Sequence, residues 1–285
     1  MSADILLRKG LSIPLKGEAT KDLKTSNTSD NFILYPDDFH GIVPKMLIKE
    51  GEKIAIGQPV FFSKANPEMQ FVSPVSGTLS KIVRGAKRRI LEIQLKSDGK
   101  EKAVKHKIPA IKNLSDTDVK SYLLASGCWP FIKQRPYDVI ANPNSTPKGI
   151  FISGFNSAPL AADVAFVLEH QEEDFQNGIN VLATLAPKVH LSVAADDNSF
   201  LSKVAGVEIH RIKGIHPAGN VGVQMHHIDP INAGETAWVV SPEDVAVIGR
   251  LFTTGVFDPQ RTIAVVGPVV TKPSYYKTRI GAAIA

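Results

Sequence analysis

The hydrophobic period of this sequence changes near residue 100, and this change limits the fold more than any other feature. Apolar and polar residues alternate one by one in residues 77–83 and 89–95, and short apolar segments recur before them. Period-two alternation is typical of strands that bury one face, and the glycines between the segments predict turns. Residues 35–100 are therefore expected to form a small all-β sandwich or barrel.

Beyond residue 108, strands and helices alternate. An apolar run that suits a buried strand lies at residues 149–153, and further strands are expected at residues 188–193, 207–212 and 237–240. A helix with one apolar stripe is expected over residues 172–185. Ser241 followed by Pro242 and two acids is a strong helix start, and Gly255 can end that helix. This order predicts a Rossmann-like α/β domain over residues 101–258.

The two ends of the sequence carry weaker patterns. Residues 1–34 are turn-rich, and the polar stretch Lys21–Asn31 is expected to be a loop. Residues 261–270 have the pattern of a strand followed by a turn, after which the sequence stops at Ala285 without a closing element. Residues 259–285 are therefore expected to begin a third unit that is cut short.

Composition argues against several classes of protein. The sequence has no window of about eighteen consecutive apolar residues and no signal peptide, which predicts a cytosolic chain without a membrane span. The single cysteine, Cys128, cannot form an internal disulfide, as expected in a reducing compartment. The net charge of +5 is concentrated in residues 1–130. This part is expected to face an acidic partner, a membrane surface or nucleic acid, or else to be a solvated basic surface.

The loop after the first α/β strand lacks the features of a nucleotide site. Ser153–Pro159 contains one glycine, no G-x-G-x-x-G and no P-loop, and Pro159 removes a backbone donor. Nucleotide binding in the usual mode is therefore not expected. A metal site is not expected either, because the adjacent His226 and His227 would point to different faces of a helix. No Cys or carboxylate stands at ligand spacing from them.

The most unusual segment is residues 214–227, in which His216 and His226 flank a glycine-bearing turn. Such histidines could bind an anion, donate a hydrogen bond to a quinone oxygen or carry a proton. The alternative is a helix-entry loop whose histidines contact solvent or a partner.

Aromatic and cationic side chains stand together in residues 128–136. Trp129 and Phe131 could stack on a flat ring, and Arg135 could bind an anion. A packed loop joining two domains would explain the same residues. Cys128 by itself is more typical of a core position than of a nucleophile. The basic turn Arg84–Arg89 suits phosphate or lipid headgroups, but equally a solvated hairpin tip or a contact with another subunit.

Residues 41–95 resemble the sandwich of biotinyl and lipoyl carriers. Glu50–Val60 followed by Val72–Leu79 carries the resemblance. In a carrier, a lysine at the tip of the intervening hairpin is modified, and Lys64 is the nearest candidate. The tip Lys64–Glu68 is longer than in carriers and lacks their usual flanking residues. The resemblance therefore implies an all-β barrel-sandwich without the prosthetic group.

The whole chain resembles the A subunit of the Na⁺-translocating NADH:quinone reductase. The segments that carry this resemblance are Arg8–Leu11 with Ile13-Pro14, Asn66-Pro67 with Phe71, Arg84–Arg88, Asn156–Ala162, His216–Gly219 with Met225-His226, and Gly267–Val270. The resemblance implies a peripheral subunit, inactive alone, that docks on membrane subunits at the cytoplasmic side of the inner membrane. Flavins and iron–sulfur would lie on partner subunits, and this chain would bind no flavin or metal. It also implies that residues 259–285 begin a truncated ubiquitin-like (SLBB-type) domain.

The same resemblance implies a part in quinone binding and reduction. The hypothesis assigns stacking to Trp129 and Phe131, and polar contacts to Arg135, His216 and His226. It assigns no catalytic residue.

The related C subunit of the Rnf electron-transport complex offers another reading, because that family holds flavin and NADH with a glycine-rich loop and an acid-containing turn. The equivalent regions here, Gly127–Phe131 and Asn156–Pro159, lack the residues that would hold a cofactor. Three alternatives stay open: a flavin- or NADH-binding subunit of Rnf type, a lipoyl-like binding module, and a purely structural docking subunit.

Overall fold

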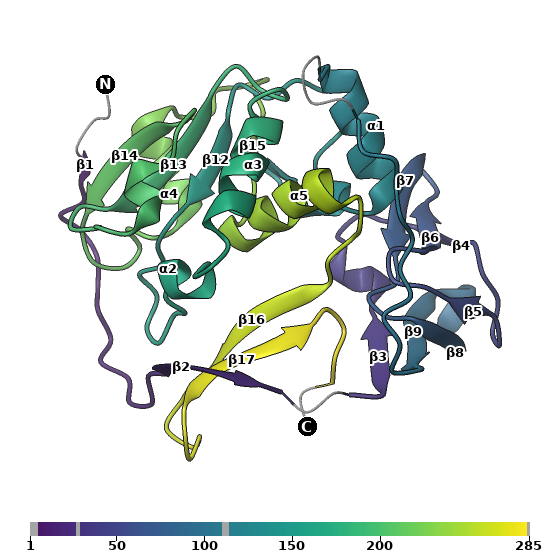
Figure 1. Ribbon diagram of the computed structural model, residues 1–285. Coiled ribbons are helices and arrows are strands. Elements are labelled where there is room, and N and C mark those ends of the chain that lie inside the picture. Colours follow the sequence, from purple (N-terminus) through teal and green to yellow (C-terminus); the bar gives the residue numbers. More distant parts are fainter. Residues whose placement is uncertain (1–4, 27–28, 110–113, 284–285) are drawn as a thin grey trace.

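The computed structural model describes residues 5–26, 29–109 and 114–283, and its largest sheet has seven strands (Figure 1). In spatial order these are β1 (Ile5–Leu6), β14 (Glu208–Lys213), β13 (Val189–Ala194), β12 (Ile150–Ser153), β15 (Ala237–Val239), β10 (Lys133–Arg135) and β11 (Val139–Ile140). Neighbours from β1 to β15 pair in parallel, whereas β10 pairs antiparallel with β15 and β11. The four strands predicted beyond residue 108 are therefore confirmed as members of one mainly parallel sheet.

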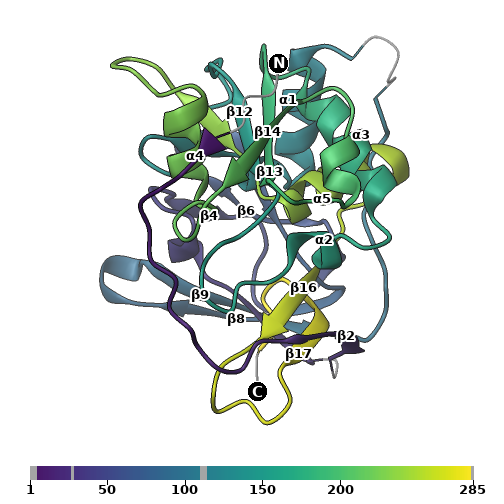
Figure 2. The same cartoon turned by 90° about the vertical axis from the view of Figure 1, so that its left-hand side faces the viewer.

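Helices cover both faces of this sheet, as Figure 2 shows. Helices α3 (Glu172–Leu182) and α5 (Pro242–Thr254) cover one face, and α4 (Val221–Ile228) covers the other. The other helical segments are α1 (Asp116–Ser126), α2 (Val164–Val167) and the 3-10 turns η4 (Trp129–Phe131) and η5 (Phe200–Lys203). Ile150 and Ile152 of β12 belong to the large core with α3 and α5, whereas Phe151 packs on the opposite face with Met225 of α4. None of the helices within the described residues combines the length and apolar character needed to cross a bilayer.

Helix α5 shows how local sequence fixes the ends of an element. The Ser241 hydroxyl accepts a hydrogen bond from the backbone N–H of Asp244, and Pro242 occupies the first turn. Gly255 closes the helix in the left-handed conformation, with φ of 71°. The predicted start and end of this helix are both confirmed.

Two glycines let α3 and α5 touch along their backbones. A Cβ at Gly178 would lie 2.0 Å from the carbonyl oxygen of Val245, and a Cβ at Gly249 would lie 1.8 Å from that of Asp174. Arg250 of α5 also joins the two helices, because its Nε donates to the Asp174 carboxylate at 2.7 Å.

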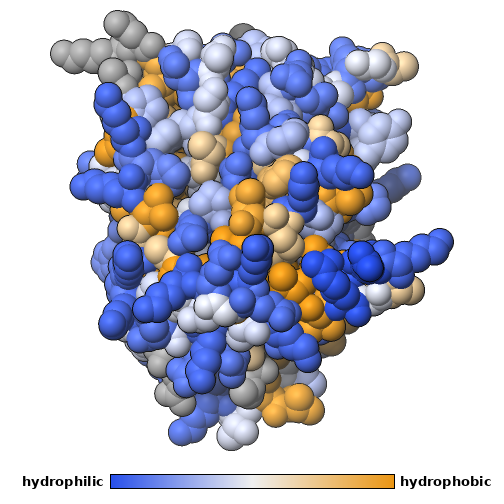
Figure 3. Space-filling view, turned by 90° about the vertical axis from the view of Figure 1, so that its right-hand side faces the viewer, coloured by the Kyte–Doolittle hydropathy of each residue, from blue (hydrophilic) through white to orange (hydrophobic). Residues whose placement is uncertain are grey.

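Residues 31–97 form a β-unit beside α1 (Figure 1). One sheet contains β3 (Asn31–Leu34), β9 (Ile90–Ser97), β8 (Gly77–Arg84) and β5 (Lys53–Ile54), and the other β4 (Pro44–Met46), β6 (Pro59–Ser63) and β7 (Asn66–Val72). The 3-10 turns η1 (Pro36–Asp38) and η2 (Ala86–Arg88) follow β3 and β8. Val60, Phe61, Leu79 and Ile93 are fully buried in its core. On the face that holds this unit, hydrophobic side chains form separate patches among hydrophilic ones (Figure 3).

The predicted small all-β sandwich is thus confirmed, and it extends further toward the N-terminus than expected. Strand β3 lies in the segment predicted to be turn-rich, and it pairs with β9. Phe32 and Leu34 point into the core, whereas Asn31 is exposed. This short alternation was hidden by the polar residues before it.

A third sheet joins segments from distant parts of the sequence. Strands β16 (Gln260–Val265) and β17 (Ser274–Arg279) form an antiparallel pair, and β2 (Thr20–Thr25) pairs in parallel with β17. The prediction of a loop over Lys21–Asn31 is therefore wrong for residues 21–25, and also for Asn31, which begins β3. Strand β2 reads Thr-Lys-Asp-Leu-Lys-Thr and is mostly exposed, so it has no hydrophobic alternation that could identify it. That residues 259–285 begin a ubiquitin-like unit stays a prediction.

Candidate functional site

Two loops meet at the carboxyl edge of the parallel sheet. The loop after β12 spans residues 154–163, and the loop after β14 spans residues 214–220. In open α/β sheets, ligands bind outside the carboxyl ends of the strands, where the strand order reverses. Here β13 and β14 lie on one side of β12, and β15 lies on the other. The loop after β12 is therefore the first place to look for binding groups.

Ser157 and His216 form the centre of this region. The Ser157 hydroxyl lies 3.2 Å from Nδ1 of His216 and accepts a 2.7 Å hydrogen bond from the backbone N–H of Gly219. Gly219 has no room for a side chain, because a Cβ there would lie 2.3 Å from the backbone nitrogen of Ser157. His216 is half-buried and its Nδ1 is engaged, so Nε2 is the ring nitrogen left to meet a ligand.

Gln224 of α4 fastens the His216 loop to the sheet. Its Nε2 donates to Ser153 Oγ at 2.9 Å and to the carbonyl oxygen of Ala218 at 3.0 Å. Gln224 is 1% exposed, and its Oε1 has no partner among the described residues. Neither Ser153 nor Gln224 was identified from the sequence. A glutamine on the buried stripe of a short helix is the signal that could have found it.

The segment after β1 brings positive charge to the His216 loop. The backbone N–H of Leu11 donates to the carbonyl oxygen of His216 at 2.9 Å, and a Cβ on Gly10 would lie 2.3 Å from that oxygen. Arg8 and Lys9, which precede this contact, are exposed. Three of the segments that carry the family resemblance therefore meet around His216.

The single glycine in the first turn of the loop after β12 is needed for packing. A Cβ at Gly154 would lie 2.9 Å from the carbonyl oxygen of Ser192 on β13. The backbone N–H of Gly154 donates to that same oxygen at 2.7 Å. Both the small size and the donor of this glycine are therefore used by the neighbouring strand, and not by the approach of a phosphate.

Trp129 lies inside the protein. Its indole is 0% exposed, and its Nε1 donates to the carbonyl oxygen of Ala141 at 2.8 Å. Its ring meets Trp238 edge to face, with 5.5 Å between the centroids. No face of this indole is open to a ligand in the structure.

Phe131 and Arg135 lie on the other side of the sheet's centre from His216. Phe131 is half-buried, its ring stacks on Phe257 at 6.2 Å, and the guanidinium of Arg261 lies 5.0 Å from its centroid. Arg135 ends β10, and three strands separate β10 from β14, which leads into His216. These two residues are therefore not neighbours of His216.

His226 lies in the last turn of α4, at the other end of the helix from the His216 loop. It is exposed, as is His227, and the two rings meet edge to face at 5.2 Å. The structure thus holds the five predicted contacts in three places: around η4 and β10, in the loop before α4, and on the last turn of α4.

A groove of about 1110 Å³ lies between the β-unit and α1. It is lined by residues 40–42, by residues 63 and 65–69 of the β6–β7 hairpin, by residues 117, 120, 121 and 124 of α1 and by residues 139–144, and by none of the five predicted contacts. Lys64 is exposed at the tip of this hairpin. Because β6 ends at Ser63 and β7 begins at Asn66, the tip of this hairpin is a two-residue turn of Lys64 and Ala65.

Comparisons with known proteins agree with the fold. A family model described as "NqrA second alpha/beta domain" matches residues 114–257, and one described as "NqrA N-terminal barrel-sandwich hybrid domain" matches residues 5–98. These matches confirm the predicted fold class, an α/β domain with an N-terminal barrel-sandwich.

Curated relatives match nearly the whole chain. The A subunit of the Na(+)-translocating NADH-quinone reductase of Haemophilus influenzae is 35% identical over 282 residues, and that of Pseudomonas aeruginosa is 36% identical over 280 residues. Both matches cover 98% of this chain and 63% of the relative. The chain therefore spans about 63% of the length of these relatives.

Among solved structures, an NAD+-reducing [NiFe]-hydrogenase in the H2-reduced state matches with a TM-score of 0.41 and 12% identity. The match covers 60% of this chain and 38% of that one. A likeness this low does not bear on function.

Proposed function

This chain belongs to the NqrA family, the A subunits of Na(+)-translocating NADH-quinone reductases, and we propose on this premise that it acts as a peripheral subunit of such a reductase. In this proposal the assembled complex moves electrons from NADH to a quinone and is coupled to sodium translocation. Flavins and iron–sulfur are carried by partner subunits, and the chain is inactive alone.

The quinone-binding part of the proposal rests on the loop around His216. Reduction of a quinone to a quinol takes two electrons and two protons, and negative charge develops on the carbonyl oxygens during the transfer. Nε2 of His216 is placed to donate a hydrogen bond to such an oxygen when Ser157 donates to Nδ1. The exposed Arg8 and Lys9 add positive charge beside this loop.

The remaining predicted contacts enter the proposal with different weight. His226, which is exposed on α4, would meet a partner or the edge of a ligand. Phe131 ends η4 just before β10 and is half-buried, so its ring can contact a ligand that approaches from β10. Arg135 is the last residue of β10. Trp129 would support Phe131 from the core, since its own ring is covered.

The docking part of the proposal rests on the segment between β1 and β2. Leu11, Ile13 and Leu15 are 67%, 52% and 55% exposed, and Ile215 beside them is 50% exposed. Exposed apolar side chains that lie together mark contact sites. We expect this segment to bind a membrane subunit of the reductase on the cytoplasmic side of the inner membrane.

The decisive test uses the assembled reductase with His216→Ala in this chain. NADH-driven quinone reduction is expected to fall by at least about 10-fold, because a hydrogen-bond donor to the reacting oxygen is lost. NADH oxidation by an artificial acceptor that bypasses the quinone should be unchanged. The matched control is His40→Ala, which removes an exposed histidine of the β-unit.

The outcomes separate the parts of the proposal. Full quinone reduction by the His216→Ala complex would exclude this loop from the quinone site. A complex that fails to assemble when Leu11 and Ile13 are both replaced by Ser, but assembles with His216→Ala, would support docking through the N-terminal segment.

A further inference from the structure

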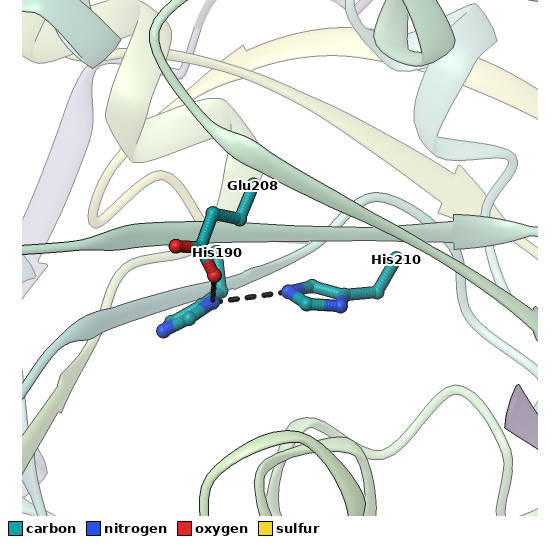
Figure 4. Close-up of side chains that lie close together, drawn as sticks. All are labelled: His190, Glu208 and His210. Carbon is teal, nitrogen blue, oxygen red and sulfur yellow. Dashed lines mark hydrogen bonds and ion pairs between the residues drawn. The ribbon is translucent and has the colours of Figure 1, made fainter. Parts of the chain in front are cut away.

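Three metal-ligating side chains converge at the amino edge of the parallel sheet, away from the His216 loop (Figure 4). His190 lies on β13, and Glu208 and His210 lie on β14. His190 is the register partner of Glu208, and His210 follows Glu208 by two residues. Because side chains alternate along a strand, all three project from the same face of the sheet.

The distances between the ligand atoms suit a single small cation. Nδ1 of His190 lies 3.0 Å from Nε2 of His210 and 3.3 Å from Oε2 of Glu208. Ligand atoms of the three residues all lie within 4.8 Å of one another. A tetrahedral zinc ion with ligands at about 2.0–2.1 Å has ligand–ligand edges of about 3.3–3.4 Å. The site would therefore need only small side-chain movements to close around such an ion.

The two histidines are buried and face each other through one ring nitrogen each. They are 2% and 5% exposed. Only one proton can lie between Nδ1 of His190 and Nε2 of His210, so one of these nitrogens donates and the other accepts. The outer nitrogens, Nε2 of His190 and Nδ1 of His210, are buried and have no partner among the described residues. A cation between the two inner nitrogens would replace this shared proton and use both lone pairs, and the outer nitrogens would then carry the ring protons.

Charge and access also suit a cation. The side chain of Glu208 is 46% exposed and leaves one side open to solvent. Lys188 pairs with the other carboxylate oxygen, Oε1, at 3.2 Å, so Oε2 stays directed to the histidines.

The ring of His190 is held in place by its neighbours. Phe151 stacks on it with 4.6 Å between centroids, and a Cβ on Gly149 would lie 3.3 Å from the ring. A ligand that is fixed before the metal arrives loses little freedom on binding.

We propose that His190, His210 and Glu208 form a site for a divalent cation of the zinc type, with a further coordination position open to water or to a partner side chain. Two imidazoles and a carboxylate are ligands that zinc accepts. The site is independent of the quinone proposal, because it lies at the opposite edge of the sheet and shares no residue with the His216 loop. Its expected effect is to clamp β13 to β14.

The test is titration of the chelator-treated chain with Zn²⁺ alone, followed by calorimetry, and with Co²⁺ followed by its absorption spectrum. We expect one tight site per chain and a cobalt spectrum typical of low coordination with nitrogen ligands. Glu208→Gln is the informative variant, since the residue is half-exposed and its loss should not prevent folding. It should weaken Zn²⁺ binding by at least about 100-fold, because even the loss of a residue that only orients a ligand can weaken binding that much.

The control is His227→Gln, which removes an exposed histidine that has His226 as its neighbour. Unchanged tight binding in this variant, together with loss in Glu208→Gln, supports the proposal. Absence of tight binding in the unaltered chain overturns it. Equal binding by the unaltered chain and Glu208→Gln, or loss of binding in His227→Gln, also overturns it, because surface histidines would then hold the ion.

Discussion

The substitution Gly249→Ala tests whether backbone contact between α3 and α5 sets the stability of the α/β domain. A Cβ at this position would lie 1.8 Å from the carbonyl oxygen of Asp174 and 2.5 Å from the backbone nitrogen of Gly178. Neither atom can rotate away, because both belong to the main chain of α3. The helices must therefore move apart to admit a single methyl group.

The expected loss of stability follows from two opposing effects. Ordinary contact at a Cβ begins near 3.4 Å, so the gap to Asp174 must widen by well over an ångström. Phe175, Ile179, Val245 and Ile248, which are 0% exposed on these helices, would lose part of their contact. Overpacking of this kind costs about 3 kcal/mol, whereas alanine gains about 1 kcal/mol over glycine in a helix. The net loss is about 2 kcal/mol, which lowers the Tm by about 4–8 °C in a domain of this size.

Thermal unfolding followed by circular dichroism measures this effect. The matched control is Gly222→Ala in α4, where the residue is exposed and a Cβ would meet nothing within 4 Å. That variant should unfold at the same temperature or slightly higher. A Gly249→Ala protein that unfolds at or above the Tm of the unaltered chain would refute the reasoning, because α3 and α5 could then move apart without a loss of stability.

Three further predictions follow from buried groups. Cys128 is fully buried, and burial raises the pKa of its thiol to about 12. The thiol should therefore resist thiol reagents in the folded chain and react when the chain unfolds. Rapid reaction in the native state would contradict this prediction. Burial lowers the pKa of His106, so the unfolded chain binds more protons than the folded chain as the pH drops below about 6.5. The stability of the fold should therefore decrease from that pH down to the folded pKa. In Tm measurements from pH 7.5 to 5, His106→Leu should make this decrease smaller. Arg250 bonds to the carboxylates of Asp174 and Asp258 and is 23% exposed, so Arg250→Met should destabilise by about 2 kcal/mol in urea unfolding. The exposed pair of Arg89 gives the comparison, since Arg89→Met should change stability by less than about 1 kcal/mol.

The parts of the fold that could be predicted are those in which local chemistry and burial agree. Helix α5 carries its own start and end signals, and strand β12 is a buried apolar run. Strand β2 could not be predicted, because its stability comes from pairing with β17 and its side chains are mostly exposed. The residues of β2 alone carry no pattern that indicates pairing with a strand about 250 residues later.

The candidate sites show the same limit. The pattern Glu208-x-His210 places two ligands on one face of a strand, but His190 joins them only through the register of β13 against β14. The aromatic character of Trp129 suggested stacking on a ligand, yet packing against Trp238 covers it. His216 was identified from its motif, whereas its partner Ser157 became evident only once the two loops were seen together.

The pairing of β2 with β17 also sets the order in which the molecule can be completed. Lys24 Nζ donates to Ser274 Oγ at 2.8 Å across a sequence separation of 250 residues. A contact this distant in sequence is expected to form late, because the loop that it closes is long. Before this contact forms, residues 20–25 have no strand to pair with, and afterwards β2 covers one edge of β17. Removing residues 20–25 would leave that edge open for pairing with another chain, so the first consequence of such a deletion would be self-association.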